Sequence, residues 1–242
     1  LSGEPGSPPA RMGLSIVDYM TGITTAVAIL SSLFGVLKGG RGHDIDVSLF
    51  DVALHQLTYP GAWYLNSGYR TERLPRSAHP STVPVQLQRT SDGWIFIMCM
   101  TQKFWVELVR TLQRPDLLTH ADYATVEARR AHRDALTALL DDVFAAATTA
   151  EWLGKLQGVL PAAPVYDLPQ ALDNPYLQTI GMVKDLPHPA QEGYRVLANP
   201  IKLDGDRLPS RRAPQLGEHT DAILRELGYD ATAIANLRAN GA

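Results

Sequence analysis

Residues 11–22 read Arg-Met-Gly-Leu-Ser-Ile-Val-Asp-Tyr-Met-Thr-Gly and lead directly into an apolar segment. From here apolar residues recur at steps of three and four, the spacing of one face of an α-helix. They are Ile16, Met20, Ile23, Val27, Leu30, Phe34 and Leu37. Gly39 and Gly40 follow, and glycine supplies the left-handed conformation in which many helices end. The pattern predicts a largely buried helix that stops just before these glycines.

Asp18 falls at or near the first turn of this helix. Backbone N–H groups and the positive end of the helix dipole favour a negative charge at that place. Aspartate is also a common N-terminal cap, so position alone does not separate a capping residue from a reactive carboxylate. The same aspartate can serve both as a cap and as a reactive carboxylate, so the sequence around it allows either role.

Composition limits the class of protein. The chain has 242 residues, of which 45% are hydrophobic, enough for one large domain or two small ones with a real core. A formal net charge of −3 provides no basic field for nucleic acid or an anionic membrane. Cys99 is the only cysteine, which excludes an internal disulfide and fits a reducing, cytoplasmic compartment. It lies in the apolar run 94–100, so we predict a buried small hydrophobe rather than a nucleophile.

The apolar segment 23–37 is shorter than the roughly 20 residues that a membrane span needs. It also contains four hydroxyl side chains, Thr24, Thr25, Ser31 and Ser32, so we expect a buried helix of a soluble protein. Residues 1–9 are rich in proline and glycine and lack the basic start and apolar centre of a signal peptide. Because Leu1 stands where an initiator methionine would, we expect the chain to begin within a longer protein.

After the glycines, polar and apolar residues alternate over 43–49, which predicts a strand with one buried face. A second helix is predicted from about Asp51, as its cap, to about Leu65. Helix, turn, strand and helix in this order are typical of an α/β fold. Residues 68–84 are rich in arginine, proline and serine and predict a long connecting loop, which is uncommon unless it is functional or joins domains.

Residues 90–160 predict an α+β unit of their own. A hairpin-like turn at 90–93 precedes a strand over 94–100, and Thr101 can cap the helix that follows. One long helical region is predicted over 125–147. Residues 148–151 read Thr-Thr-Ala-Glu, which resembles a capping box for a further short helix.

The remaining segments are shorter. Prolines at the density of 161–165 favour an extended edge strand over a central one. The other predicted elements are a helix at 168–172, strands at 182–183 and 194–197, a helix opened by 214–220 and closed by Gly228, and a last helix at 230–239.

Common catalytic motifs are missing. The sequence has no Gly-x-Gly-x-x-Gly loop, no P-loop lysine and no Gly-x-Ser-x-Gly. The Gly-rich residues 39–42 follow a helix and precede the predicted strand, the wrong order for a phosphate site, so we interpret them as a turn. No Cys/His spacing indicates zinc, and no metal site is expected. Motif analysis alone ends at a soluble α/β protein.

Four separated stretches carry a resemblance that runs along nearly the whole chain. They are residues 13–22 (Gly-Leu-Ser-Ile-Val-Asp-Tyr-Met-Thr-Gly), 40–51, 161–165 with 174–175 and 181–183, and 214–220 with 226–229. In this order they resemble the family III CoA-transferases of the CaiB/BaiF type, which include formyl-CoA transferases and α-methylacyl-CoA racemases. The resemblance implies a Rossmann-like large domain, a smaller α+β domain and an interlocked homodimer in which each ring-like chain threads the other.

The resemblance also implies how the domains divide. Residues 1–70 would belong to the large domain, residues 75–185 to the small domain with its linkers, and residues 186–242 would return to the large domain. In the family most residues that contact CoA lie upstream of the position of Leu1. We therefore expect this stretch alone to bind CoA poorly.

The resemblance places Asp18 at the catalytic aspartate of the family. In the transferases this carboxylate attacks an acyl-CoA thioester, which gives a mixed anhydride and CoA thiolate, and an acceptor carboxylic acid then takes the place of the first acid. The coenzyme A thioester is thus a substrate, no cofactor is expected to stay bound, and the partners are an acyl-CoA and a small carboxylic acid.

Two further positions are candidate substrate-binding residues. Gly22, one turn after Asp18, would leave space for the approach of the substrate, or would serve close helix packing. His79, followed by Pro80, matches a His-Pro pair of the family's linker, and the alternative is a solvent-exposed histidine in a rigid loop. Glu218 and His219 fall in a recurrent family motif that N-terminal helix structure explains equally well.

Three hypotheses follow. The first is an acyl-CoA:carboxylate CoA-transferase. The second is a 2-methylacyl-CoA racemase or epimerase, in which the aspartate moves the α-proton with a histidine partner. The third is a non-catalytic scaffold subunit. The stretch around Asp18 resembles the transferases more than the Gly-Asp-Phe-Gly-Gly-Gly pattern of racemases, while the glycine-rich loop of formyl-CoA transferases has no counterpart, which argues against oxalate and formyl-CoA.

Overall fold

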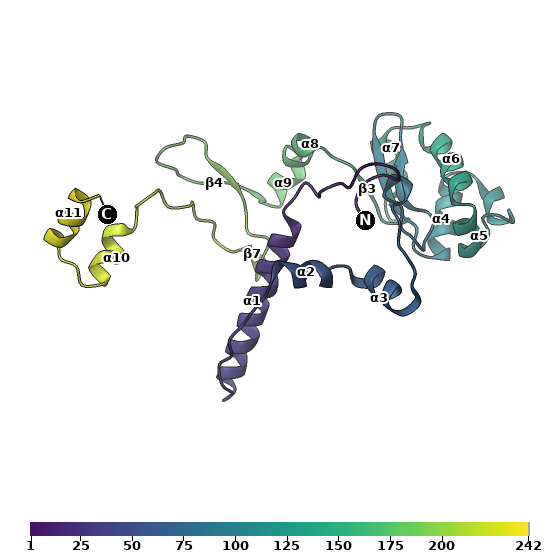
Figure 1. Ribbon diagram of the computed structural model, residues 1–242. Coiled ribbons are helices and arrows are strands. Elements are labelled where there is room, and N and C mark those ends of the chain that lie inside the picture. The colour runs from purple at the N-terminus through teal and green to yellow at the C-terminus, as the bar shows by residue number, and fades with distance from the viewer. Residues whose placement is uncertain (242) are drawn as a thin grey trace. The chain divides into compact units, whose positions relative to one another are not determined.

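Helix α1 begins at Ile16 and ends at Leu37 in the computed structural model, which describes residues 1–241 (Figure 1). The N–H of Lys38 donates to the carbonyl oxygens of Phe34 and Gly35, each at 3.1 Å, and closes the last turn. Gly39 follows with a φ of +87°, in the left-handed region that favours glycine. The predicted helix and its end at the glycines are confirmed.

The expectation that α1 is largely buried is wrong for this chain by itself. None of its residues is buried, and Leu30 and Phe34 are 65% and 62% exposed. Helix α2 (Leu49–His55) contacts it and leaves most of the apolar surface open. By length and composition α1 could cross a membrane, and the core helices of soluble proteins satisfy the same criteria.

The region after α1 differs from the prediction in two ways. Residues 43–48 form no strand, because nothing within residues 1–241 pairs with them. The predicted helix 51–65 is two helices, α2 and α3 (Thr58–Ser67), and α2 is capped by Ser48 rather than Asp51. The Oγ of Ser48 accepts a hydrogen bond from the N–H of Asp51 at 3.0 Å. The long loop that follows contains a single 3₁₀ turn, η1 (Pro75–Ser77).

A three-stranded antiparallel sheet forms the middle of the chain. Strand β2 (Trp94–Met98) lies between β1 (Val85–Arg89) and β3 (Ala162–Pro164). The turn at 90–93 joins β1 to β2 with Arg89 opposite Trp94. The prediction did not name β1, but the hairpin turn is confirmed, and so is the edge position of the proline-rich strand.

Four helices belong to the same unit as this sheet: α4 (Gln102–Thr111), α5 (Val126–Ala131), α6 (Arg133–Phe144) and α7 (Thr149–Leu156), with a 3₁₀ turn, η2 (Pro115–Leu118), after α4. Helix α6 contacts β1 and α7 contacts β3. The core contains Ile95, Ile97, Trp105, Leu108, Leu136, Leu140, Phe144, Trp152 and Leu156. The caps predicted at Thr101 and in the capping box at Thr148 are confirmed. The predicted helix 125–147 is wrong as one element, because it breaks at His132 into α5 and α6.

Cys99 lies in this core and is 1% exposed. Burial raises the pKa of its thiol to about 12, although the charge of Arg129 acts in the opposite direction. A thiol that stays protonated is a poor nucleophile. The predicted burial of Cys99 is confirmed, and the raised pKa supports the prediction that it is no nucleophile.

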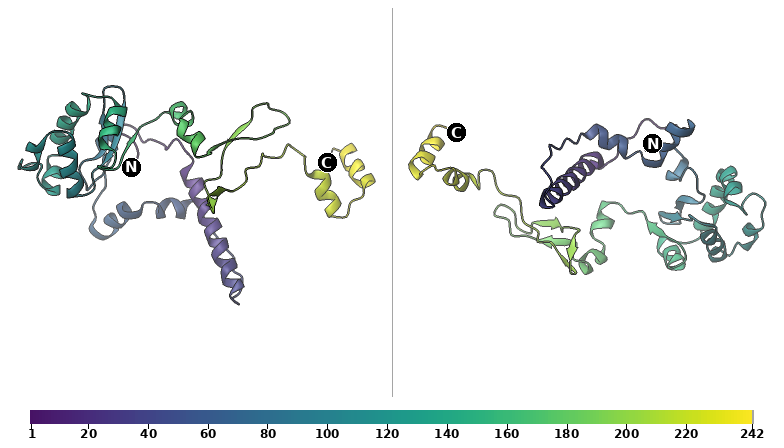
Figure 2. Two further views of the ribbon diagram at one scale, coloured as in Figure 1. Left: turned by 180° about the vertical axis from the view of Figure 1, so that it is seen from behind. Right: turned by 90° about the horizontal axis from the view of Figure 1, so that it is seen from below.

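Residues 1–165 and the residues from 166 onward form two separate compact units, and the second unit has its own small elements. These are α8 (Leu168–Leu172), α9 (Pro175–Thr179), β4 (Val183–Asp185), β5 (Arg195–Leu197), β6 (Lys202–Leu203), β7 (Asp206–Arg207), α10 (Thr220–Glu226) and α11 (Ala231–Ala239), seen from two further sides in Figure 2. The strands pair as two antiparallel hairpins, β4–β5 and β6–β7. The prediction missed α9 and the β6–β7 hairpin, and the division into three segments stays a prediction.

Leu140→Ala tests the core of the first unit. Leu140 is fully buried, so its truncation removes transfer free energy and leaves a cavity, which lowers the free energy of unfolding by about 2–5 kcal/mol. Met100→Ala, at a side chain that is 44% exposed, is the control and costs less. Chemical denaturation of both variants measures the difference, and equal losses would contradict the assignment of the core.

Candidate functional site

Asp18 occupies the third residue of α1, and the N-cap position belongs to Ser15, whose side chain makes no capping hydrogen bond. Within residues 1–241 no hydrogen bond or ion pair engages the Asp18 carboxylate, and the residue is exposed. The reading of Asp18 as the N-cap is therefore wrong. The first turn of a helix leaves N–H groups without intrahelical partners, so the carboxylate stands where the helix dipole favours negative charge.

Gly22 lies four residues after Asp18, on the same side of α1. A methyl group added there would meet no atom within 4 Å in residues 1–241. Among the described residues, Gly22 leaves open space one turn from the carboxylate and makes no close packing contact.

His79 is half-buried and bonded on both sides of its ring. Its Nδ1 accepts hydrogen bonds from the backbone N–H groups of Ser81 and Thr82, both at 3.3 Å. Because Nδ1 accepts, the proton of the neutral ring is on Nε2, which lies 3.3 Å from the hydroxyl of Tyr59 in α3. His79 therefore ties the connecting loop 68–84, here called the linker, to α3, and it is not a histidine that simply faces solvent.

Arg133, at the start of α6, also holds the backbone of the linker at His79 and Pro80. Its Nη2 donates to the carbonyl oxygens of His79 at 2.8 Å and Pro80 at 3.2 Å. Burial lowers the pKa of His79 below its ordinary value, and the charge of Arg133 lowers it further. The imidazole is thus kept neutral near pH 7, as a hydrogen-bonding group of defined tautomer.

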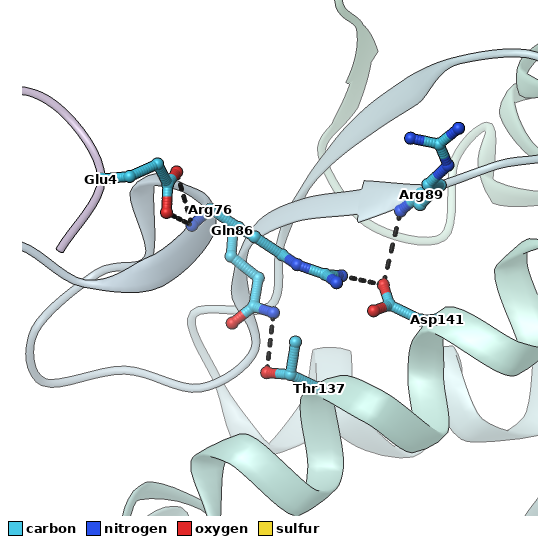
Figure 3. A network of polar contacts seen from close by, with 6 residues as sticks. All are labelled: Glu4, Arg76, Gln86, Arg89, Thr137 and Asp141. Atoms are coloured by element: carbon cyan, nitrogen blue, oxygen red, sulfur yellow. Dashed lines mark hydrogen bonds and ion pairs between the residues drawn. The ribbon is translucent and has the colours of Figure 1, made fainter. Parts of the chain in front are cut away.

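The linker is also anchored to the beginning of the chain (Figure 3). The carboxylate of Glu4 accepts hydrogen bonds from the N–H of Arg76 at 2.9 and 3.1 Å. The guanidinium of Arg76 forms an ion pair with Asp141 of α6, and beside it the amide of Gln86 donates to Thr137 at 2.9 Å. The beginning of the chain, which leads into α1, is thereby attached to the linker at Arg76.

The two main candidate site residues, Asp18 and His79, share no direct polar contact. Within residues 1–241 no hydrogen bond or ion pair joins Asp18 to His79. Sequence reasoning missed Tyr59 and Arg133, which hold the turn of His79. Arg133 is 54 residues from His79 along the chain, and no local pattern links such positions.

Glu218 is occupied by structural contacts. Arg212 donates to both of its carboxylate oxygens, at 2.8 and 2.6 Å, and the N–H of Gln215 donates at 2.7 Å. The hydrogen bonds from Arg212 have the largest effect and the one from the N–H of Gln215 the next largest, and they lower the pKa of Glu218 to about 2. These bonds favour the reading of the motif at 218–219 as structure ahead of α10. In residues 1–241 no group of three or more acidic, His or Cys side chains could hold a metal ion.

Comparison of the sequence with known families gives one match over most of the chain. The family described as CoA-transferase family III matches residues 1–220. An acyl-CoA transferase of Fusarium pseudograminearum is 33% identical over 245 residues, covering 100% of this chain and 54% of the relative. The human succinyl-CoA:glutarate CoA-transferase is 28% identical, covering 100% of this chain and 56% of the relative. The chain thus spans about half the length of the curated relatives it matches.

Solved structures agree with the sequence match. A CAIB/BAIF family protein from Brucella suis superposes with a TM-score of 0.74 at 33% identity, covering 94% of this chain and 59% of that protein. The Rv3272 protein of Mycobacterium tuberculosis superposes with a TM-score of 0.77 at 25% identity, covering 91% of this chain and 58% of that protein. The similarity extends over both units of the chain.

Arg133→Gln tests the electrostatic part of this site. Removal of the positive charge raises the pKa of His79, while the depression caused by burial persists. Because the folded pKa of His79 is below the unfolded value, His79 contributes stability at and above pH 6.5, and that stability falls as the pH drops from 6.5 through the folded pKa. An NMR titration of the His79 ring in both proteins measures the shift. An unchanged or lower pKa in the variant would refute the role of Arg133.

Proposed function

Because the chain belongs to CoA-transferase family III, we propose that the complete protein is an acyl-CoA:carboxylate CoA-transferase whose nucleophile is Asp18. The observation that carries the proposal is the unengaged carboxylate in the first turn of α1, within the part of the chain that the family match covers. Relatives named as CoA-transferases for different pairs of acids support the reaction class and leave the two acids open.

The proposed chemistry begins with attack of an Asp18 oxygen on the thioester carbonyl carbon. A C–O bond forms, the C–S bond breaks, and the electron pair leaves with sulfur as CoA thiolate. The thiolate then attacks the aspartyl carbonyl of the anhydride, which releases the donor acid as its carboxylate. The acceptor carboxylate repeats these steps in reverse, so that CoA ends on the acceptor and Asp18 is regenerated. Because a thiolate and a carboxylate leave, no proton has to move.

Gly22 and His79 are proposed to bind substrate. The open space at Gly22 supports an approach to Asp18 from that side of α1. A neutral His79 with its Nε2 proton toward Tyr59 supports a role in shaping the linker as a binding surface. The coenzyme A thioester enters as a substrate, and no permanently bound cofactor takes part.

We further propose that residues 1–70 and 186–242 belong to a Rossmann-like large domain and residues 75–185 to the small domain. The exposed apolar surface of α1 supports this arrangement, because an apolar patch of this kind is typical of a surface that packs against another part of a protein. In the complete enzyme the cover would come from the rest of the large domain in an interlocked homodimer. We place this enzyme in the cytoplasm, where acyl-CoA and small carboxylic acids are its partners.

Asp18→Asn in the complete protein tests the proposal. An amide is a poor nucleophile, so kcat for exchange of CoA between two acids falls by at least about 10³-fold. Asp134→Asn is the matched control, because Asp134 also lies in the first turn of a helix, α6, and is exposed. The control keeps its turnover.

A parallel assay separates the transferase from the racemase. Deuterium from solvent that enters the α-carbon of a 2-methylacyl-CoA, without exchange of CoA between acids, would replace the proposal by racemisation. A folded protein with neither CoA transfer nor racemisation would favour the hypothesis of a non-catalytic scaffold subunit. Wild-type turnover in Asp18→Asn would refute the assignment of the nucleophile.

A further inference from the structure

A cavity of about 410 Å³ lies between α3, the linker and α5. Trp63 and Ser67 contribute from α3, Tyr69, Pro80 and Ser81 from the linker, and Arg130 from α5. All six residues belong to the first unit of the chain, and Asp18 is not among them. Trp63, Ser67 and Tyr69 are close in sequence, whereas Arg130 lies about 50 residues beyond Pro80 and Ser81.

The apolar part of this cavity has fixed walls. Trp63 packs against Tyr59, with ring centroids 4.8 Å apart, and meets Tyr69 edge to face at 5.8 Å. Pro80 is held through its carbonyl oxygen by Arg133. Aromatic rings and a proline that are already in place lose little freedom on binding, so they suit the apolar body of a ligand.

The polar groups of the lining residues are the guanidinium of Arg130 and the hydroxyls of Ser67, Tyr69 and Ser81. The hydroxyl of Ser67 donates to the carbonyl oxygen of Trp63 at 2.7 Å, and that of Ser81 lies 3.3 Å from Nδ1 of His79. Within residues 1–241 no hydrogen bond or ion pair engages the guanidinium of Arg130, and this residue is exposed. The cavity therefore offers a ligand a single cationic group.

We propose that this cavity binds a carboxylic acid, with its carboxylate on Arg130 and its carbon chain against Trp63, Tyr69 and Pro80. A planar guanidinium matches a carboxylate in a paired, two-bond geometry. One cation fits a singly charged head group better than the two or three charges of a nucleotide phosphate. The identification of this acid as a substrate rests on the proposed function, whereas the binding site itself does not.

Equilibrium titration of the complete protein, without CoA, tests the site with acetate and hexanoate as probes. Hexanoate binds more tightly than acetate, because its chain reaches the aromatic wall. Arg130→Gln weakens hexanoate binding about 10-fold or more, and Arg130→Lys, which keeps the charge without the paired geometry, weakens it less. Trp63→Ala weakens hexanoate more than acetate. Arg110→Gln, at an exposed arginine of α4 outside the cavity, leaves both affinities unchanged.

Three results would overturn the site: no binding of either acid, hexanoate binding that Arg130→Gln leaves unaltered, or binding in this cavity of adenosine 3′,5′-bisphosphate but not of hexanoate. Circular dichroism of each variant establishes that it is folded. The readout is independent of turnover, so the two proposals fail separately. If Asp18→Asn loses turnover but Arg130→Gln binds hexanoate as tightly as the wild type, only the acid-binding site is refuted. If Asp18→Asn keeps turnover but Arg130→Gln binds hexanoate more weakly, only the proposed transferase mechanism is refuted.

Discussion

The first turn of α1 is the constraint on which the functional account depends. A helix start leaves backbone N–H groups without intrahelical acceptors, and here the cap residue, Ser15, offers no side-chain oxygen to them. The nearest negative charge along the helix is Asp18, in that same turn. Helix geometry thus gives the carboxylate a favourable place, and the absence of engaged partners in residues 1–241 leaves both of its oxygens open for chemistry.

The linker shows how the chain holds a shaped surface without regular secondary structure. Arg129, which is 1% exposed, donates to the carbonyl oxygens of Val83 and Tyr123 at 2.9 and 2.8 Å and to the side chain of Gln102 at 3.0 Å. All three acceptors are neutral, and burial lowers the pKa of Arg129. Together with Arg133 at the turn of His79, this buried cation fixes the end of the linker against the helical unit.

Local signals predicted local structure well. Thr101 and Thr148 cap helices as their sequence context indicates, and the turn at 90–93 closes a hairpin. The errors concern features that depend on distant partners. Residues 43–48 alternate as a strand does but find nothing to pair with, and the apolar face of α1 finds no cover in residues 1–241. The contacts of His79 with Tyr59 and Arg133 join positions 20 and 54 residues apart in sequence, which no periodicity encodes.

In the proposed reaction the carboxylate of Asp18 carries a covalent bond to an acyl group or to CoA during turnover. The most direct measurement incubates the complete protein with an acyl-CoA and hydroxylamine and locates the modified residue by peptide mass spectrometry. We expect a hydroxamate at Asp18 that forms only when acyl-CoA is present. An unmodified Asp18 in an enzyme that turns over, or a hydroxamate at a different carboxylate, would contradict it.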